Sequence, residues 1–462
     1  MKKSVLFSVF SSFLIILLFN ANSALGQQDV SKGWRAGVAR AIITPEEPMW
    51  MAGYASRDHV SEGTLVDLWA KVLAIEDTKG KKVVLVTTDL LGIPRKMSDR
   101  IRNQIAIKYG LTRSQIILSS SHTHTGPVLM DALFDIYPLD EKQTEAIRNY
   151  SNNLEKKIVG LTGDAIRSMV PAQLSSQNGV TRFQVNRRNN SETTLSNQTS
   201  LIGPNDYSVP VLKVTDASGN LLAVVFGYAC HATVLSFYQF SGDYPGFAQI
   251  ELERMHPGVT AMFFQGAGAD QNPLPRRTVP LAQQYGRELA AAVDRILNEE
   301  TKILEPFIST AYSEVNLTFT TPPTIEELTK MEKEKEGYQK KWAASQLEIL
   351  RKNGSLITSY PYPVQIWKLG DQSIMTMGGE PVVQYSIELK KLFGPDVFVM
   401  GYANDVMAYI PSETILKDGG YEGELSQMVY GMPGKWDSDI QVKILKEFEK
   451  LAVKTGVKQV AK

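Results

Sequence analysis

The chain has 462 residues, and its 49 Lys and Arg side chains balance 49 Asp and Glu side chains, so the formal net charge is zero. A neutral chain lacks the basic surface with which proteins bind nucleic acid, and we expect no nucleic-acid partner. The chain has one cysteine, Cys230, which excludes an internal disulfide and favours a core that is stable without one.

The first 26 residues have the pattern of a secretory signal peptide. The basic start MKK is followed by the apolar run VLFSVFSSFLIILLF and by small residues in NSALG. The apolar run falls short of the about 18 residues of a membrane span, so we expect cleavage and no stable membrane span afterwards. An uncleaved membrane anchor is the alternative. The prediction is a secreted or periplasmic protein whose residues 27–462 form one domain.

Short apolar, β-branched runs alternate with helical patterns along the rest of the chain. Strands are predicted at 70–77, 81–89, 114–121, 209–216, 221–230, 259–266, 372–380 and 396–405. Helices are predicted from the N-cap Ser98 to Gly110 and at 141–169, 280–298, 326–354 and 438–453, the fourth being one long helix with a solvated, charged face. This alternation is typical of a single mixed α/β domain with a largely buried sheet.

The helix from Ser98 to Gly110 and the two strands that flank it predict where a site lies. A right-handed crossover makes strands 81–89 and 114–121 parallel, so that Asp89 and His122 follow strand ends at the same edge of the sheet. Ligands of open α/β sheets bind outside the carboxyl ends of the strands. We therefore expect the functional site at the carboxyl ends of the strands.

Two of the five histidines, His122 and His124, follow a buried strand in the sequence SSSHTHTGP. A histidine pair in a loop at a sheet edge indicates a metal site or proton transfer, although a hydrogen-bonded core pair is the alternative. His231 also ends an apolar strand, and Cys230 beside it is expected to be buried and to face away. Glu380 follows an apolar run and two glycines, and is either a metal ligand or an acid in the first turn of the next helix. The two other histidines, His59 and His256, are expected at the surface.

An ordered series of motifs resembles the neutral ceramidases, also called neutral/alkaline non-lysosomal ceramidases, over residues 34–434. The motifs are GVARAIITP, MAGYA, LSSSHTHTGP, VNR at 185–187, ACHAT, SGDYPGFA, FFQGAGADQNP, GGEP and YANDVMAYIPSETILKDGGYEG. No single motif would suffice, but their order and their positions at strand ends make the resemblance specific.

The resemblance implies one zinc ion and a set of functional residues. In the family, two His, one Glu and one Tyr hold the zinc, and these match His122, His231, Glu380 and Tyr409. His124 matches the second histidine of the family motif and Tyr421 a further active-site tyrosine, so both are predicted to be catalytic. Arg187 matches an arginine near the substrate. With such a ligand set, the implied reaction is hydrolysis of an N-acyl (amide) bond by a metal-activated water, in sphingolipid metabolism.

The sequence departs from the family at two places. Gly266 stands where the family carries a serine discussed as a nucleophile, so a covalent route through that serine is excluded. We also expect no C-terminal immunoglobulin-like domain of the family, because the sequence continues only briefly after the last motif. Recognition of long-chain ceramide is then left open.

The substrate is the least determined part of this prediction. The segment 128–140 offers Phe134 and Tyr137 as part of an apolar wall for substrate, or alternatively as ordinary packing. The expected ligand is a small molecule, an N-acylated lipid or sugar derivative. A zinc hydrolase with a non-lipid substrate, such as a sugar-derived amide, ester or glycoside, and a non-catalytic binding protein are the alternatives.

Overall fold

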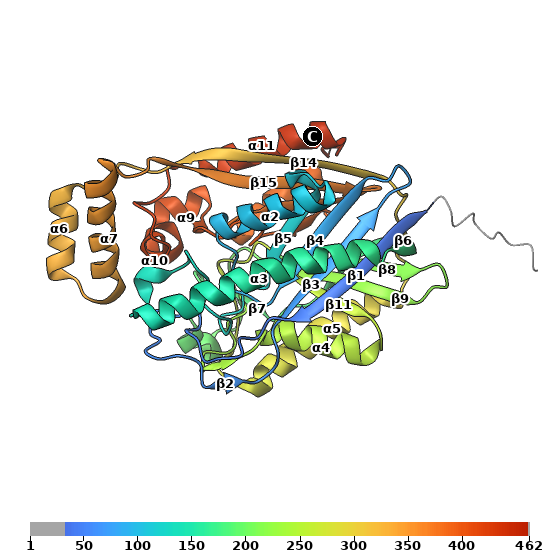
Figure 1. The fold of residues 1–462 in the computed structure, drawn as a ribbon, viewed down its shortest axis with the longest axis horizontal. Coiled ribbons are helices and arrows are strands. Elements are labelled where there is room, and N and C mark those ends of the chain that lie inside the picture. Colours follow the sequence, from blue (N-terminus) through green and yellow to red (C-terminus); the bar gives the residue numbers. More distant parts are fainter. Residues whose placement is uncertain (1–32, 461–462) are drawn as a thin grey trace, which may run out of the picture.

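The computed structural model describes residues 33–460, so the predicted signal peptide lies outside the described residues. Its larger sheet has nine strands, in the order β11-β9-β8-β6-β1-β3-β4-β5, with β13 paired to β6 (Figure 1). The strands are β1 (Trp34–Ile42), β3 (Trp69–Glu76), β4 (Lys82–Thr88), β5 (Ile116–Ser120), β6 (Val170–Val180), β8 (Ser208–Asp216), β9 (Leu221–Tyr228), β11 (Thr260–Gln265) and β13 (Lys302–Ile303). The pairs β4–β5 and β9–β11 are parallel, and the other pairs are antiparallel.

A second sheet packs against the first. It has the order β14-β15-β16-β18 and consists of β14 (Ile308–Thr318), β15 (Ser359–Leu369), β16 (Gln372–Met377) and β18 (Phe398–Met400). Apolar side chains of both sheets form one core cluster, in which Leu85 and Phe264 of the larger sheet join Trp367 of the smaller one. Both sheets are therefore buried between other layers.

Helices cover the outer face of each sheet. On the larger sheet these are α2 (Arg95–Tyr109), α3 (Glu141–Arg167), α4 (Asp243–Met255) and α5 (Val279–Leu297). On the smaller sheet these are α8 (Val383–Phe393) and α11 (Ile440–Thr455), and Figure 1 shows α11 along the outer side of β14 and β15. The layers run helix, sheet, sheet, helix, which confirms the predicted mixed α/β fold with a largely buried sheet. None of the helices in residues 33–460 combines the length and apolar character needed to cross a membrane.

Short elements complete the chain and lie mostly in the loops between the layers. They are β2 (Gly63–Thr64), β7 (Gln184–Asn186), β10 (Gln239–Phe240), β12 (Gln271–Pro273), β17 (Glu380–Pro381), β19 (Tyr409–Ile410), α9 (Glu413–Asp418), a π-helix (Tyr421–Leu425), α10 (Ser426–Val429), and 3-10 turns at Arg113–Gln115, Phe134–Ile136 and Glu192–Asn197.

The predicted unit of two parallel strands and a helix is present, with Thr88 of β4 opposite Ser120 of β5. The helix ends at Gly110 as expected, because Gly110 adopts a left-handed conformation with φ 71°. Its predicted start at Ser98 is wrong, since α2 begins at Arg95, directly after Pro94. Ser98 lies in the first turn, where its N–H donates to Pro94 O at 3.0 Å.

The single long helix predicted at 326–354 is also wrong. The structure has two helices, α6 (Ile325–Glu334) and α7 (Gly337–Asn353), which form a hairpin that projects from the body at the left of Figure 1. Lys335 and Glu336, which lie between them, have an extended backbone with ψ 162° and 173°, and this breaks the helix. The break lets Leu328 of α6 pack against Trp342 of α7 in a small core of their own.

Candidate metal centre

The candidate site lies where chain segments that follow strands of the two sheets come together. His122 and His124 follow β5 and His231 follows β9, so these three come from the larger sheet. Glu380 and Tyr409 pair as neighbours in β17 and β19, next to the smaller sheet. Hydrogen bonds connect the two sides here, for example from Leu118 N of β5 to Asn404 Oδ1 at 3.0 Å. The site is therefore assembled only when both sheets are packed together.

The backbone adopts a left-handed conformation on both sides of the site, at His122 and at Gly379. His122 has φ 59°, a left-handed conformation that is uncommon for residues other than glycine and that turns the chain at the end of β5. Gly379, with φ 62°, precedes Glu380, and a Cβ there would lie 2.6 Å from Ala408 O. Only glycine allows the backbone to approach this closely, so the pair of glycines sets the position of Glu380.

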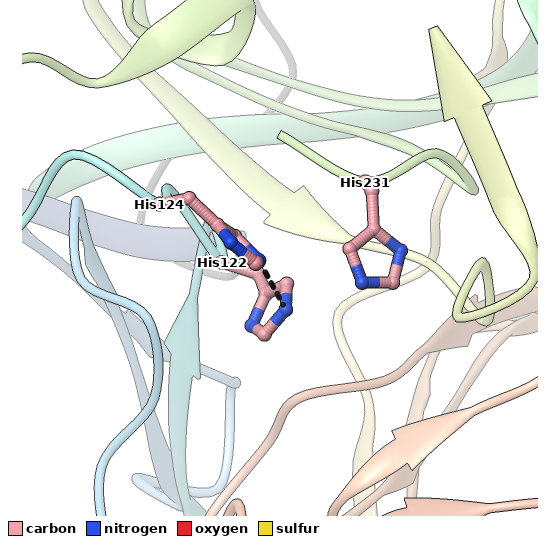
Figure 2. Close-up of side chains that lie close together, drawn as sticks. All are labelled: His122, His124 and His231. Atoms are coloured by element: carbon pink, nitrogen blue, oxygen red, sulfur yellow. Dashed lines mark hydrogen bonds between the residues drawn. The ribbon is translucent and has the colours of Figure 1, made fainter. Parts of the chain in front are cut away.

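The side chains of His122, His124, His231 and Glu380 converge. The Nε2 atoms of His122 and His231 each lie 3.1 Å from the same Glu380 oxygen, Oε2. His124 Nε2 lies 3.1 Å from His122 Nε2, and Figure 2 shows these two rings facing His231 across a short gap. One ligand atom from each of the three histidines lies within 4.8 Å of the others. All four residues are buried, His124 being the most exposed at 9%.

The hydrogen bonds behind two of the histidines fix which nitrogen carries the proton. His122 Nδ1 lies 2.7 Å from Leu91 O, and His231 Nδ1 lies 3.1 Å from Gly268 O. A carbonyl oxygen only accepts, so each Nδ1 carries the hydrogen and each Nε2 presents a lone pair to Glu380. Lone pairs and a carboxylate that face one another repel unless a cation lies between them. The donor set therefore suits a divalent metal ion, with the second nitrogen of each histidine held as is usual for metal ligands.

The protonation states agree with this description. Burial lowers the pKa of His231 to about 4, and it lowers the pKa of His124 well below 6.5. Both rings are thus neutral at pH 7 and can offer a lone pair. Burial alone would raise the pKa of Glu380, whereas positive charge on the side of His122 and His231 lowers it well below its usual range. A cation bound between the neutral rings would supply this charge and keep the carboxylate ionised.

Two tyrosines that sequence reasoning missed also contact Glu380. The Tyr430 hydroxyl donates to Glu380 Oε1, and the Tyr402 hydroxyl lies 3.4 Å from Oε2. Burial and the nearby Glu380 raise the pKa of Tyr430 well above 10, so its hydroxyl keeps its proton and remains a donor. Neither tyrosine was singled out, because nothing in its sequence spacing connects it with Glu380.

The predicted residues Tyr409, Arg187 and Tyr421 lie on one side of the histidines. The Tyr409 hydroxyl is 3.3 Å from His231 Nε2, and Arg187 Nη2 is 3.2 Å from the same hydroxyl. The Tyr421 ring lies 5.4 Å from the Tyr409 ring and is 42% exposed, so it lies between the buried centre and solvent. Burial raises the pKa of Tyr421 to about 12. These three residues are brought together as one group.

The predicted apolar wall is less closely connected to the centre. Tyr137 is 1% exposed, packs 5.5 Å from the Trp50 ring and accepts a hydrogen bond from Gly53 N at 2.9 Å. Gly53 in turn lies against His124, since a Cβ on it would be 2.5 Å from that ring. Phe134 is half-buried and packs against the same core. A substrate contact for Phe134 and Tyr137 remains a prediction.

Other residues considered in the sequence lie outside the group of histidines. The Asp89 carboxylate accepts from Trp69 N and Gln249 rather than from a histidine. Cys230 is buried in the core beneath the site. His59 is half-exposed beside Asp58, and His256 is partly buried beside Asp294. A Cβ on Gly266 would lie 3.0 Å from Ala229 Cα, so the local packing leaves little room for a serine at that position.

Comparison with known proteins identifies similar chains. The profile of the family described as "Neutral/alkaline non-lysosomal ceramidase, N-terminal" matches residues 34–330, more than half of the chain. The neutral ceramidase of Drosophila melanogaster is 26% identical over 235 residues, which are 49% of this chain and 33% of that protein. Neutral ceramidase A of Dictyostelium discoideum is 25% identical over 48% of this chain and 32% of that protein. The matched part thus spans about a third of the length of these curated relatives.

The fold is similar to a solved structure over most of its length. The crystal structure of neutral ceramidase from Pseudomonas aeruginosa superposes with a TM-score of 0.71 at 20% identity, covering 92% of this chain and 75% of that chain. A complex titled "Ceramidase complexed with C2" gives the same TM-score at 19% identity, over 93% of this chain and 76% of that one. These likenesses establish a shared fold.

Proposed function

Because the chain belongs to the neutral/alkaline non-lysosomal ceramidase family, we propose that it is a zinc-dependent hydrolase that cleaves an N-acyl (amide) bond. The observation that carries the proposal is the set of buried donors: two Nε2 lone pairs, from His122 and His231, directed at one ionised oxygen of Glu380. We assign these three residues and Tyr409 as the zinc ligands. Nitrogen and oxygen donors of this kind are typical of catalytic zinc sites.

Zinc in such a site acts as a Lewis acid and lowers the pKa of water to about 7. In the overall reaction the oxygen of water joins the acyl carbon, the bond from that carbon to nitrogen breaks, and the amine leaves with a proton. His124 lies beside His122, is neutral and is the most exposed of the three histidines, so we assign it to orient water and to deliver the proton to the leaving nitrogen.

Arg187 and Tyr421 lie on the other side and are assigned to substrate. Arg187 is fixed by Glu422 at 2.8 Å and by the Tyr409 hydroxyl, so its guanidinium is already oriented when substrate arrives. The half-exposed Tyr421 ring lies where a substrate would pass from solvent to the centre. Such fixed donors stabilise negative charge that develops on the acyl oxygen. The pattern of residues 1–26 supports export of the protein to the periplasm or the medium, as part of the proposal.

The experiment is an amide-hydrolysis assay on the purified protein with and without metal. We expect release of hexanoate from at least one of N-hexanoyl-sphingosine, N-hexanoyl-glucosamine and N-hexanoyl-glutamate, loss of that activity after chelation, and its return with zinc. The Glu380→Gln variant should stay inactive after zinc is added. Activity that persists in the metal-free protein, or no release from any of the three amides by the zinc-loaded protein, would contradict the proposal.

A further inference from the structure

A polar pocket opens beside the candidate metal centre. It has a volume of about 800 Å³ and is lined by the segment that follows β7, by the chain around β12 and by the start of the π-helix at Tyr421. Arg187 and Tyr421, which contact Tyr409, also line this pocket. Arg187 is therefore shared between the pocket and the centre, and a substrate held at the centre can extend past Tyr421 into the pocket.

The lining of the pocket is hydrophilic. Leu274 is the one aliphatic side chain among the thirteen residues that line it, and the others include Asn189, Asn190, Asn272 and Gln198. An acyl chain gains about 0.8 kcal/mol for each methylene that it buries against apolar surface, but it gains little against amides and guanidinium groups and would remove them from water. This pocket therefore suits a polar part of a substrate rather than a long acyl chain.

The charges in the pocket leave an excess of positive charge. Glu422 is buried between two arginines, with Oε1 2.8 Å from Arg187 Nε and Oε2 2.7 Å from Arg188 Nη1. Burial alone would raise the pKa of Glu422, but Arg187 and Arg188 hold it below its usual range, so the three groups together carry one positive charge. Arg276 forms an ion pair with the half-exposed Glu192, so the pocket as a whole keeps a net charge of one positive unit.

Arg276 has free hydrogen-bond donors in this pocket. Its Nε lies 2.8 Å from Glu192 Oε2, while no partner within residues 33–460 reaches its two terminal nitrogens. Its side chain is only 16% exposed, so these nitrogens are held near the pocket wall rather than extended into solvent. A pair of guanidinium nitrogens of this kind matches the two oxygens of a carboxylate.

We infer that the pocket binds an anionic group of the substrate, and that Arg276 and Arg188 determine specificity for amides that carry a carboxylate a few bonds from the N-acyl bond. This inference rests on the proposed amide hydrolysis and narrows its substrate class from neutral lipid amides to anionic, water-soluble ones. Hydrolysis of such a compound consumes one water and yields the free acid of the acyl group and an amine that retains the carboxylate.

The test compares two substrates that differ only in charge. N-hexanoyl-glutamate carries two carboxylates, and the α-amide of N-hexanoyl-glutamine has the same size and no charge. We expect kcat/KM of the zinc-loaded wild-type protein to be at least about tenfold higher for the glutamate derivative, since a hydrogen bond to a charged group has this effect or a larger one. The Arg276→Gln variant should reduce this preference by about tenfold, mainly through KM.

Arg295→Gln is the matched control, because Arg295 lies on an exposed face of α5 in an ion pair with Glu299. It should keep the wild-type preference. Equal kcat/KM for the two substrates, or a preference that Arg276→Gln leaves unchanged, would overturn the inference while amide hydrolysis itself stands. A preference for N-hexanoyl-sphingosine over both would have the same meaning. Failure of the zinc-loaded protein to hydrolyse any of these amides would overturn the proposed function and this inference together.

Discussion

Tyr430 provides a sharp test of how the centre is held, because it contacts Glu380 without being one of the proposed ligands. The Tyr430→Phe variant removes a hydroxyl that donates to Glu380 Oε1 and leaves the ring in place. Glu380 is 2% exposed, so water cannot easily replace this donor. The lost hydrogen bond to a buried charged group costs about 1.5–3 kcal/mol. We therefore expect zinc to bind roughly ten to a hundred times more weakly, the range found for hydrogen-bond partners of metal ligands.

Zinc affinity is measured by competition with a chromogenic chelator, and thermal unfolding of the metal-free variant reports whether the fold is intact. Tyr150→Phe is the matched control, since the Tyr150 hydroxyl donates to Ile43 O at 2.6 Å, a backbone carbonyl that belongs to no part of the centre. It should bind zinc as the wild type does. A Tyr430→Phe variant that is folded and binds zinc within twofold of the wild type would show that the Tyr430 hydroxyl does not support zinc binding by Glu380.

Three further predictions concern the leaving-group proton, the backbone and the response to pH. His124→Gln should keep zinc while kcat falls by about 10²–10⁴-fold, as expected for loss of a general acid, and steady-state kinetics with metal analysis check this. Loss of zinc from this variant would instead identify His124 as a metal ligand. Gly268→Ala should lower the free energy of unfolding by about 1–3 kcal/mol or more, because the new Cβ would lie 2.4 Å from the Ala229 carbonyl carbon; an unchanged melting temperature would contradict this. Burial raises the pKa of Asp405 from 3.8 to about 7, so the folded state binds the proton of this carboxyl more tightly than the unfolded state does. The protonated carboxyl therefore contributes fully to the free energy of unfolding below about pH 4, and this contribution is lost as the pH rises to about 7. Asp405→Asn should therefore gain stability relative to the wild type between pH 5 and pH 8, by roughly 3 kcal/mol at most, since about two pKa units at about 1.4 kcal/mol each fall in this window. Denaturant titrations that show the same difference at both pH values would exclude this role.

The elements that the sequence predicts correctly have continuous apolar runs or clear ends. The eight predicted strands correspond to strands of the two sheets, and helices α3, α5 and α11 match their predicted ranges to within a few residues. Strands β6, β14 and β15 were missed because they are only partly buried or carry prolines, as at Pro361 and Pro363, so their apolar residues do not form a run. α4 begins at Asp243, within a segment whose Gly and Pro residues predict a turn.

For the site, the sequence identifies residues that follow strand ends, because a strand directs the next side chain to the sheet edge. His122, His231 and Glu380 were found in this way, and the structure brings them together across two sheets. Tyr430, Arg188 and their contacts could not be found, since they depend on how the chain after α9 folds back over the centre. Tyr430 lies 50 residues from Glu380 in the sequence, and no local pattern records that proximity.

The proposed function depends on one zinc ion held by His122, His231, Glu380 and Tyr409. The most direct test measures the zinc content of the purified protein by elemental analysis. The protein is first stripped of all metal, then reloaded with a slight excess of zinc and desalted. We expect one zinc per chain in the wild type and much less than one in folded His122→Ala and His231→Ala variants. A wild-type protein that retains no zinc, or variants that retain one full equivalent, would contradict it.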